Sequence, residues 1–143
     1  MSRGAQQFRI NNYMRIPEHI QKAIKEQGVY ILGTSSKENV PNLIYVKFLK
    51  VYNDSQILIA DNKFFKTEKN LKENPQMSFV ILDKERGKSY QLKGGVEIYQ
   101  NGPIFEETVK WVEELRSSPT TEAKSAVILN IEEIYSGANK ILE

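Results

Sequence analysis

The chain has 143 residues, of which 40% are hydrophobic and 27% are charged, and its formal net charge is +2. This length and composition are typical of one globular domain and exclude a disordered chain. The sequence contains no cysteine, which excludes disulfides, thiolate nucleophiles and cysteine-ligated metal sites and is consistent with a reducing compartment. No segment approaches the roughly 20 consecutive apolar residues of a membrane span or the apolar core of a signal peptide, so we expect a cytoplasmic protein without membrane contact. The low net charge does not favour nucleic acid as a partner.

Residues 1–13 are polar and aperiodic, so we expect an N-terminal extension followed by one domain over residues 14–143. The apolar residues that come next recur at helical spacing and predict a helix over residues 17–27, which Gly28 can end. The single histidine, His19, falls in this helix without a second candidate ligand nearby in the sequence. This isolation favours a surface or packing role for the histidine over metal binding.

Three β-rich runs follow the first helix, separated by short polar segments. They cover residues 29–34, 40–51 and 56–60, and their short connections predict an antiparallel meander. Lys66–Glu73 then has the pattern of a short helix that follows the third strand directly and that an Asn-Pro pair ends.

The rest of the chain predicts two paired strands, a longer helix and a last strand. The paired strands cover residues 76–82 and 89–99, and Gly94-Gly95 occurs where a bulge or a sharp bend of a barrel strand favours glycine. An amphipathic helix begins at Pro103, and residues 125–134 form the last strand. This order predicts a mainly β, α+β fold of six antiparallel strands, which a small barrel with flanking helices closes most simply.

The short helix at Lys66 is the most informative part of the sequence. Its first turn carries Lys66 and Thr67, and helix N-termini present unpaired N–H groups and the positive end of the helix dipole, so a phosphate fits there. On spacing alone, capping by Thr67 and solvation of Lys66 are the simpler interpretation.

The same segment resembles the FMN-binding split barrels of the pyridoxamine 5′-phosphate oxidase-like family. That family's pattern is a hydrophobic strand and a polar loop, then Lys-Thr or Arg-Lys, then Asn-Leu and Asn-Pro; here these pairs are Lys66-Thr67, Asn70-Leu71 and Asn74-Pro75. The order of the pairs carries the resemblance, which extends over roughly residues 16–134. It implies a six-stranded antiparallel split β-barrel that binds FMN and forms a homodimer with cofactor sites at the interface.

The resemblance also implies the residues of the cofactor site. Lys66 and Thr67 would hold the FMN phosphate, and the backbone of two neighbouring strands would line the isoalloxazine ring. Gln91 is the candidate for a glutamine that reaches the flavin from the partner subunit, with a solvent-facing role as the alternative. Phe64 and Phe65 stand where relatives have small residues, and either a cover over the flavin or core packing explains them. The implied cofactor-site residues are Ile44, Tyr45, Val46, Lys47, Ala60, Asp61, Asn62, Phe65, Lys66, Thr67 and Gln91.

Two departures from the family pattern argue against oxidation of pyridoxamine phosphate. The strand around residues 44–47 lacks the arginine of the vitamin-oxidising enzymes, and their C-terminal substrate-binding segment has no counterpart here. We therefore expect an FMN-dependent oxidoreductase or electron-transfer protein with a small-molecule or protein redox partner. A deazaflavin or another phosphorylated cofactor fits the same phosphate site. The alternative from another class is a non-enzymatic small barrel that binds single-stranded nucleic acid through tyrosine, phenylalanine and lysine.

Overall fold

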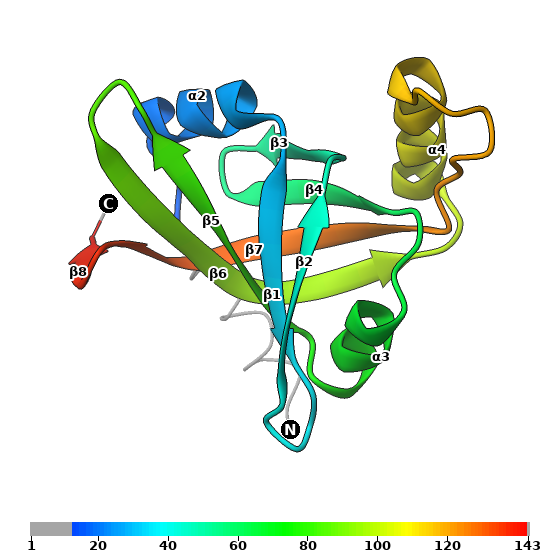
Figure 1. Cartoon of the computed structure of the whole chain (residues 1–143), viewed down its shortest axis with the longest axis horizontal. Coiled ribbons are helices and arrows are strands. Elements are labelled where there is room, and N and C mark those ends of the chain that lie inside the picture. The colour runs from blue at the N-terminus through cyan, green and yellow to red at the C-terminus, as the bar shows by residue number, and fades with distance from the viewer. Residues whose placement is uncertain (1–12, 143) are drawn as a thin grey trace.

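The computed structural model describes residues 13–142 as one antiparallel sheet flanked by three helices (Figure 1). Residues 1–12 of the expected N-terminal extension lie outside the described residues. The elements are, in chain order, α2 (Glu18–Gln27), β1 (Tyr30–Ser35), β2 (Pro41–Val46), β3 (Leu49–Asn53), β4 (Gln56–Asp61), α3 (Lys66–Glu73), β5 (Gln76–Asp83), β6 (Lys88–Tyr99), α4 (Pro103–Leu115), β7 (Ser125–Ser136) and β8 (Asn139–Ile141).

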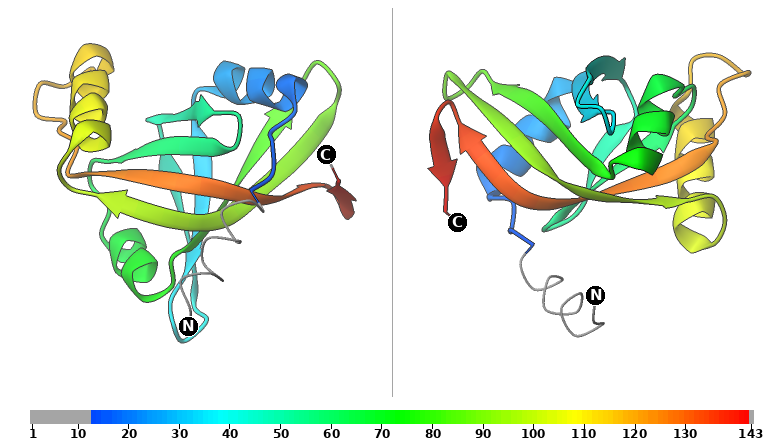
Figure 2. Two further views of the ribbon diagram at one scale, coloured as in Figure 1. Left: turned by 180° about the vertical axis from the view of Figure 1, so that it is seen from behind. Right: turned by 90° about the horizontal axis from the view of Figure 1, so that it is seen from below.

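The sheet curls into a half-barrel because its two end strands are neighbours in the sequence. The strand order is β2-β1-β5-β6-β7-β4-β3, with β8 paired to β7. Six strand spacings would separate β2 from β3 by about 29 Å in a flat sheet. Only Lys47 and Phe48 join these two strands, and such a connection spans at most about 11 Å. The sheet must therefore bend until its ends approach each other (Figure 2).

β6 bends at Gly94, where it pairs with both β5 and β7. β6 pairs with β5 over residues 88–95 and with β7 over residues 91–99, and the register with β7 shifts between Lys93 and Gly94. A Cβ atom on Gly94 would lie 1.8 Å from the carbonyl oxygen of Asn130, so no residue with a side chain fits this close approach. The bulge predicted at the glycine pair is confirmed.

The helices pack on different parts of the sheet. Ile20 and Ile24 of α2 are fully buried in the main core, while Val112 of α4 joins Phe48 and Ala60 in a second, smaller cluster. α4 thereby holds the segment that follows it close to the connection between β2 and β3. Within residues 13–142 the helices have 8 to 13 residues, and none has the length and apolar character that crossing a membrane requires.

The predicted helices and the mainly β, antiparallel character of the sheet are confirmed, but six strands is too few, because the described residues form eight. The run over residues 40–51 divides into β2 and β3, because Lys47 and Phe48 leave the strand and the Phe48 ring is buried in the second cluster. β8 follows a turn at Gly137, whose φ of 60° is one that glycine adopts readily.

Candidate functional site

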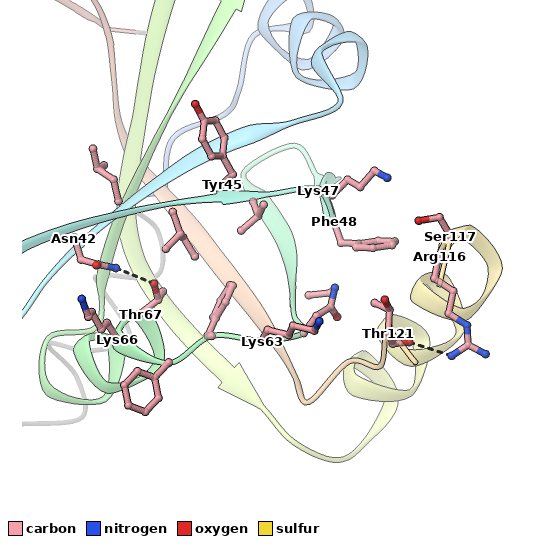
Figure 3. A pocket seen from close by; sticks show the side chains of 17 residues that line it. Asn42, Tyr45, Lys47, Phe48, Lys63, Lys66, Thr67, Arg116, Ser117 and Thr121 are labelled. Carbon is pink, nitrogen blue, oxygen red and sulfur yellow. Dashed lines mark hydrogen bonds between the residues drawn. The ribbon is translucent and has the colours of Figure 1, made fainter. Parts of the chain in front are cut away.

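A cavity of about 660 Å³ lies between β2 and the loop that joins β4 to α3 (Figure 3). β2 ends the sheet order, so one of its edges presents backbone N–H and C=O groups that no described strand pairs. The volume is in the range of small-molecule and cofactor sites. The cavity is lined by Asn42, Leu43, Ile44, Tyr45, Val46, Lys47, Phe48, Ala60, Asn62, Lys63, Phe64, Phe65, Lys66, Thr67, Arg116, Ser117 and Thr121.

One end of the cavity is the start of α3. No side chain of residues 13–142 caps this helix, so the N–H groups of its first turn have no side-chain acceptor there. Thr67 is buried, and its hydroxyl oxygen accepts a 3.1 Å hydrogen bond from Nδ2 of Asn42 on β2 (Figure 3). Lys66 lies exposed beside it. The capping interpretation of Thr67 is wrong, and a positive charge, a hydroxyl and the helix dipole meet at this end.

The opposite end of the cavity combines two segments that are far apart in the sequence. Lys47 and Phe48 belong to the connection after β2, and Arg116, Ser117 and Thr121 belong to the segment after α4 (Figure 3). Nη1 of Arg116 donates a 3.0 Å hydrogen bond to the carbonyl oxygen of Thr121. This bond ties the Arg116 side chain to the segment that follows α4, and one nitrogen of the guanidinium makes it, so other N–H groups remain for a ligand.

The charged side chains that line the cavity are all positive. Among the described residues, its lining contains no aspartate or glutamate and four basic side chains, those of Lys47, Lys63, Lys66 and Arg116. None of the four forms an ion pair within residues 13–142. Because the whole chain carries 18 acidic residues and a net charge of only +2, this excess of positive charge is local. The cavity therefore favours an anionic ligand.

Asp61 lies behind the cavity and does not line it. Its Oδ1 accepts the Phe64 N–H at 2.9 Å and its Oδ2 accepts the Ser125 hydroxyl at 3.1 Å. Burial raises the pKa of this carboxyl, although both hydrogen bonds and the charge of Lys124 oppose the rise. Lys124 Nζ also donates to the Phe64 carbonyl oxygen at 3.2 Å. The predicted site residue Asp61 thus has a structural position that supports the β4–α3 loop.

The two phenylalanines of this loop have opposite environments. Phe64 is 8% exposed and belongs to the main core, whereas Phe65 is 82% exposed and lines the cavity. Core packing is confirmed for Phe64, whereas a cover over the flavin stays a prediction for Phe65. Phe64 packs in the core, and Phe65 is the aromatic side chain that is free to cover a ligand.

Asn62 carries an unusual polar atom. Its Oδ1 is buried and has no hydrogen-bond partner among the described residues. Such atoms are rare, because burial without a partner costs about 1–3 kcal/mol. Asn62 lines the cavity, but its Oδ1 is itself buried and is not accessible from the cavity.

Gln91 is the predicted residue that lies farthest from this arrangement. It is exposed on β6, opposite Val80 of β5, and it is absent from the cavity of its own chain. Apart from Asp61 and Gln91, the structure brings the predicted residues together along the cavity. These residues are Ile44, Tyr45, Val46, Lys47, Ala60, Asn62, Phe65, Lys66 and Thr67.

Sequence reasoning missed part of the lining. Asn42 and Lys63 adjoin predicted residues, so contiguity along β2 and the loop could have found them. No sequence signal joins Arg116 to this site, because it depends on the pairing of β7 with β4 and on the packing of α4. The missed residues are Asn42, Leu43, Phe48, Lys63, Phe64, Arg116, Ser117 and Thr121.

Known proteins share both the sequence pattern and the fold. A family model described as pyridoxamine 5′-phosphate oxidase matches residues 16–137. An uncharacterised protein of Methanocaldococcus jannaschii is 33% identical over 130 residues, which cover 88% of this chain and 83% of the relative. HupZ of Group A Streptococcus superimposes with a TM-score of 0.77 at 21% identity, over 90% of this chain and 99% of that one. An FMN-binding protein from Syntrophomonas wolfei superimposes with a TM-score of 0.72 at 17% identity, over 98% of this chain and 95% of that one. The half-barrel sheet and the matched family model identify the chain as a member of the pyridoxamine 5′-phosphate oxidase-like split-barrel family.

Proposed function

We propose that this protein binds FMN in the cavity, with the phosphate at the N-terminus of α3. The observation that carries the proposal is a basic lining without acidic residues that meets an uncapped helix start. Lys66 supplies charge there, and the Thr67 hydroxyl and the first-turn N–H groups supply hydrogen bonds to phosphate oxygens. The FMN-binding protein of Syntrophomonas wolfei, which shares the fold, supports a flavin as the ligand.

The remaining lining suits the isoalloxazine ring. The polar edge of this ring carries an N–H group and carbonyl oxygens, which match the unpaired backbone groups at the edge of β2. Phe65 is free to cover the ring at the mouth of the cavity. These contacts would orient the ring along β2, away from the phosphate end.

A bound flavin supplies electron transfer, and the chain supplies binding and orientation. Lys47 and Arg116, at the end opposite α3, would hold an anionic substrate or electron acceptor next to the ring. Ser117 lies beside them (Figure 3). We therefore infer an FMN-dependent oxidoreductase or electron-transfer protein whose second ligand is negatively charged.

We further propose that the protein acts as a C2 homodimer that joins through the outer face of β1, β2, β5 and β6. Tyr45, Ile31, Val80 and Gln91 form one row across these strands, because each is the register partner of the next. Tyr45 is 75% exposed, and Val80 and the neighbouring Leu82 are also exposed. In a two-fold interface on this face, Gln91 of each subunit approaches Tyr45 of the other, at the edge of the other's cavity.

The test is a titration of the wild type and of Lys66→Ala with FMN and with riboflavin, which has the same ring and no phosphate. A hydrogen bond to a charged group is worth about 1.5–3 kcal/mol, so Lys66→Ala should weaken FMN binding roughly ten- to a hundredfold. Riboflavin affinity should be unchanged. Lys69→Ala is the matched control, since Lys69 is exposed on the same helix and outside the cavity.

Equal losses for both flavins, or no loss for either, would place the phosphate elsewhere. The visible spectrum of the purified protein is the second readout. Oxidised flavin bands would support FMN as the ligand. Deazaflavin bands would mean that the phosphate site is as proposed but that the bound ring is a deazaflavin.

A further inference from the structure

The Thr67 hydroxyl has one hydrogen-bond partner among the described residues, and that partner can only donate. Asn42 Nδ2 lies 3.1 Å from Thr67 Oγ1, and an amide nitrogen has no acceptor capacity. The hydroxyl oxygen is therefore the acceptor, and the hydroxyl hydrogen has no acceptor within residues 13–142.

The start of α3 explains why this hydrogen is free. A threonine inside a helix can donate to the carbonyl oxygen one turn earlier, as Thr108 does to Ile104 at 2.8 Å. Thr67 is the second residue of α3, and no such bond forms from its hydroxyl.

We infer that Asn42 is a positioning residue that turns the Thr67 hydroxyl hydrogen toward an anion in the cavity. Both residues line the cavity, and Lys66 stands beside them. The Asn42 amide approaches the Thr67 hydroxyl oxygen from the β2 side. The hydroxyl hydrogen therefore points to the other side, toward the cavity. This inference rests on the proposed function and adds a residue that selects phosphorylated flavins.

The chain contains a matched pair that serves as a control. Asn70, one turn further along α3, donates from Nδ2 to Thr34 Oγ1, also at 3.1 Å. Asn70 and Thr34 are both buried and both lie outside the cavity. Loss of this second pair should therefore affect stability without distinguishing one flavin from another.

The experiment is a double-mutant cycle of Asn42→Ala and Thr67→Val, titrated with FMN and riboflavin. Asn42→Ala should weaken FMN binding about three- to tenfold, the equivalent of one neutral hydrogen bond, and leave riboflavin binding unchanged. The double variant should bind FMN no more weakly than Thr67→Val alone, because Asn42 acts through the hydroxyl that valine lacks. Thr67→Ser, which keeps the hydroxyl, should retain the preference for FMN.

Asn70→Ala is titrated in parallel, and thermal unfolding checks that each variant is folded; Thr67→Ala replaces Thr67→Val if the latter does not fold. Additive losses in the double variant would overturn the inference, because Asn42 would then contact the phosphate directly. Equal losses for both flavins in Asn42→Ala would also overturn it. If Lys66→Ala weakens FMN while Asn42→Ala does not, only the inference fails. If the wild type binds FMN no more tightly than riboflavin, both the proposed function and this inference fail.

Discussion

Asp61 lies behind the cavity and holds the β4–α3 loop, which forms part of the cavity wall. Its carboxylate joins the Phe64 N–H to the Ser125 hydroxyl, and Lys124 holds the Phe64 carbonyl oxygen. The N–H of Phe64 is therefore anchored to the end of β4, and its carbonyl oxygen is anchored to the residue before β7. This anchoring sets the direction in which the chain continues into Phe65 and α3.

Asp61→Asn should change how stability depends on pH. Burial raises the pKa of Asp61 in the folded state, so the folded protein keeps this proton to higher pH than the unfolded chain. As the pH rises from the ordinary pKa range of a carboxyl through the raised pKa, the wild type should therefore lose stability relative to Asp61→Asn. Above the raised pKa, the difference in the free energy of unfolding between the two proteins should stay constant. Urea unfolding of both proteins across this pH range measures the effect.

The asparagine side chain keeps an acceptor for the Phe64 N–H and adds a donor for Ser125, so the fold should persist. Glu85→Gln is the control, because Glu85 is exposed and its pair with Lys22 is a surface ion pair, which contributes little. A pH-independent difference between the wild type and Asp61→Asn would contradict the prediction.

Single residues of the loop show what sequence can and cannot determine. Lys66 and Thr67 could be placed at a helix start, because the pattern of a strand followed directly by a helix is local. The environments of Phe64 and Phe65 could not be separated, since two adjacent aromatic residues have the same local signal. Which of them is buried depends on the nearby anchor at Asp61 and on the anchor that Lys124 provides from a distant part of the chain.

At the scale of the elements, the bend of β6 depends on one missing side chain. Gly94→Ala would place a methyl group 1.8 Å from the Asn130 carbonyl oxygen, and that backbone belongs to the paired strand β7. The clash cannot be relieved by a side-chain rotation. We expect a loss of about 3 kcal/mol or more in the free energy of unfolding, which denaturant titration measures.

Gly95→Ala is the adjacent control. The nearest atom to its added Cβ would be Oε2 of Glu132 at 3.4 Å, at the end of a flexible side chain. Its effect should stay within about 1 kcal/mol, as for an ordinary strand substitution. Comparable losses at the two positions would show that the close approach at Gly94 does not determine the bend.

The elements also differ in how well the sequence predicts them. The helices and the glycine bulge could be predicted, because periodicity, end signals and paired glycines are local features. The break between β2 and β3 could not, since Lys47 and Phe48 include no turn-forming residue and leave the strand for the burial of Phe48. The segment after α4 likewise reaches the cavity only through tertiary packing.

At the scale of the whole molecule, the exposed side chains of Tyr45, Val80 and Leu82 on the outer face predict the oligomeric state. Val80→Arg should convert a dimer into a monomer at micromolar concentration, because it buries a charge in the proposed interface. The monomer should also bind FMN more weakly, since it loses Gln91 of the partner subunit. Sedimentation equilibrium and flavin titration of the same samples measure both effects.

Leu142→Arg is the control, because Leu142 is equally apolar, 80% exposed and outside the outer face. It should leave both the dimer and the flavin affinity unchanged. A wild type that is monomeric with flavin bound would contradict the shared site and would remove Gln91 from it.

Trp111 gives the molecule an internal optical reporter. It is the single tryptophan of the chain, and its ring meets Phe48 edge to face at a centroid distance of 5.5 Å. Phe48 lines the cavity, so one aromatic ring separates the indole from any ligand inside. Indole emission overlaps flavin absorption, and energy transfer over so short a path is efficient. Binding of the proposed flavin should therefore lower the intrinsic fluorescence of the unlabelled protein.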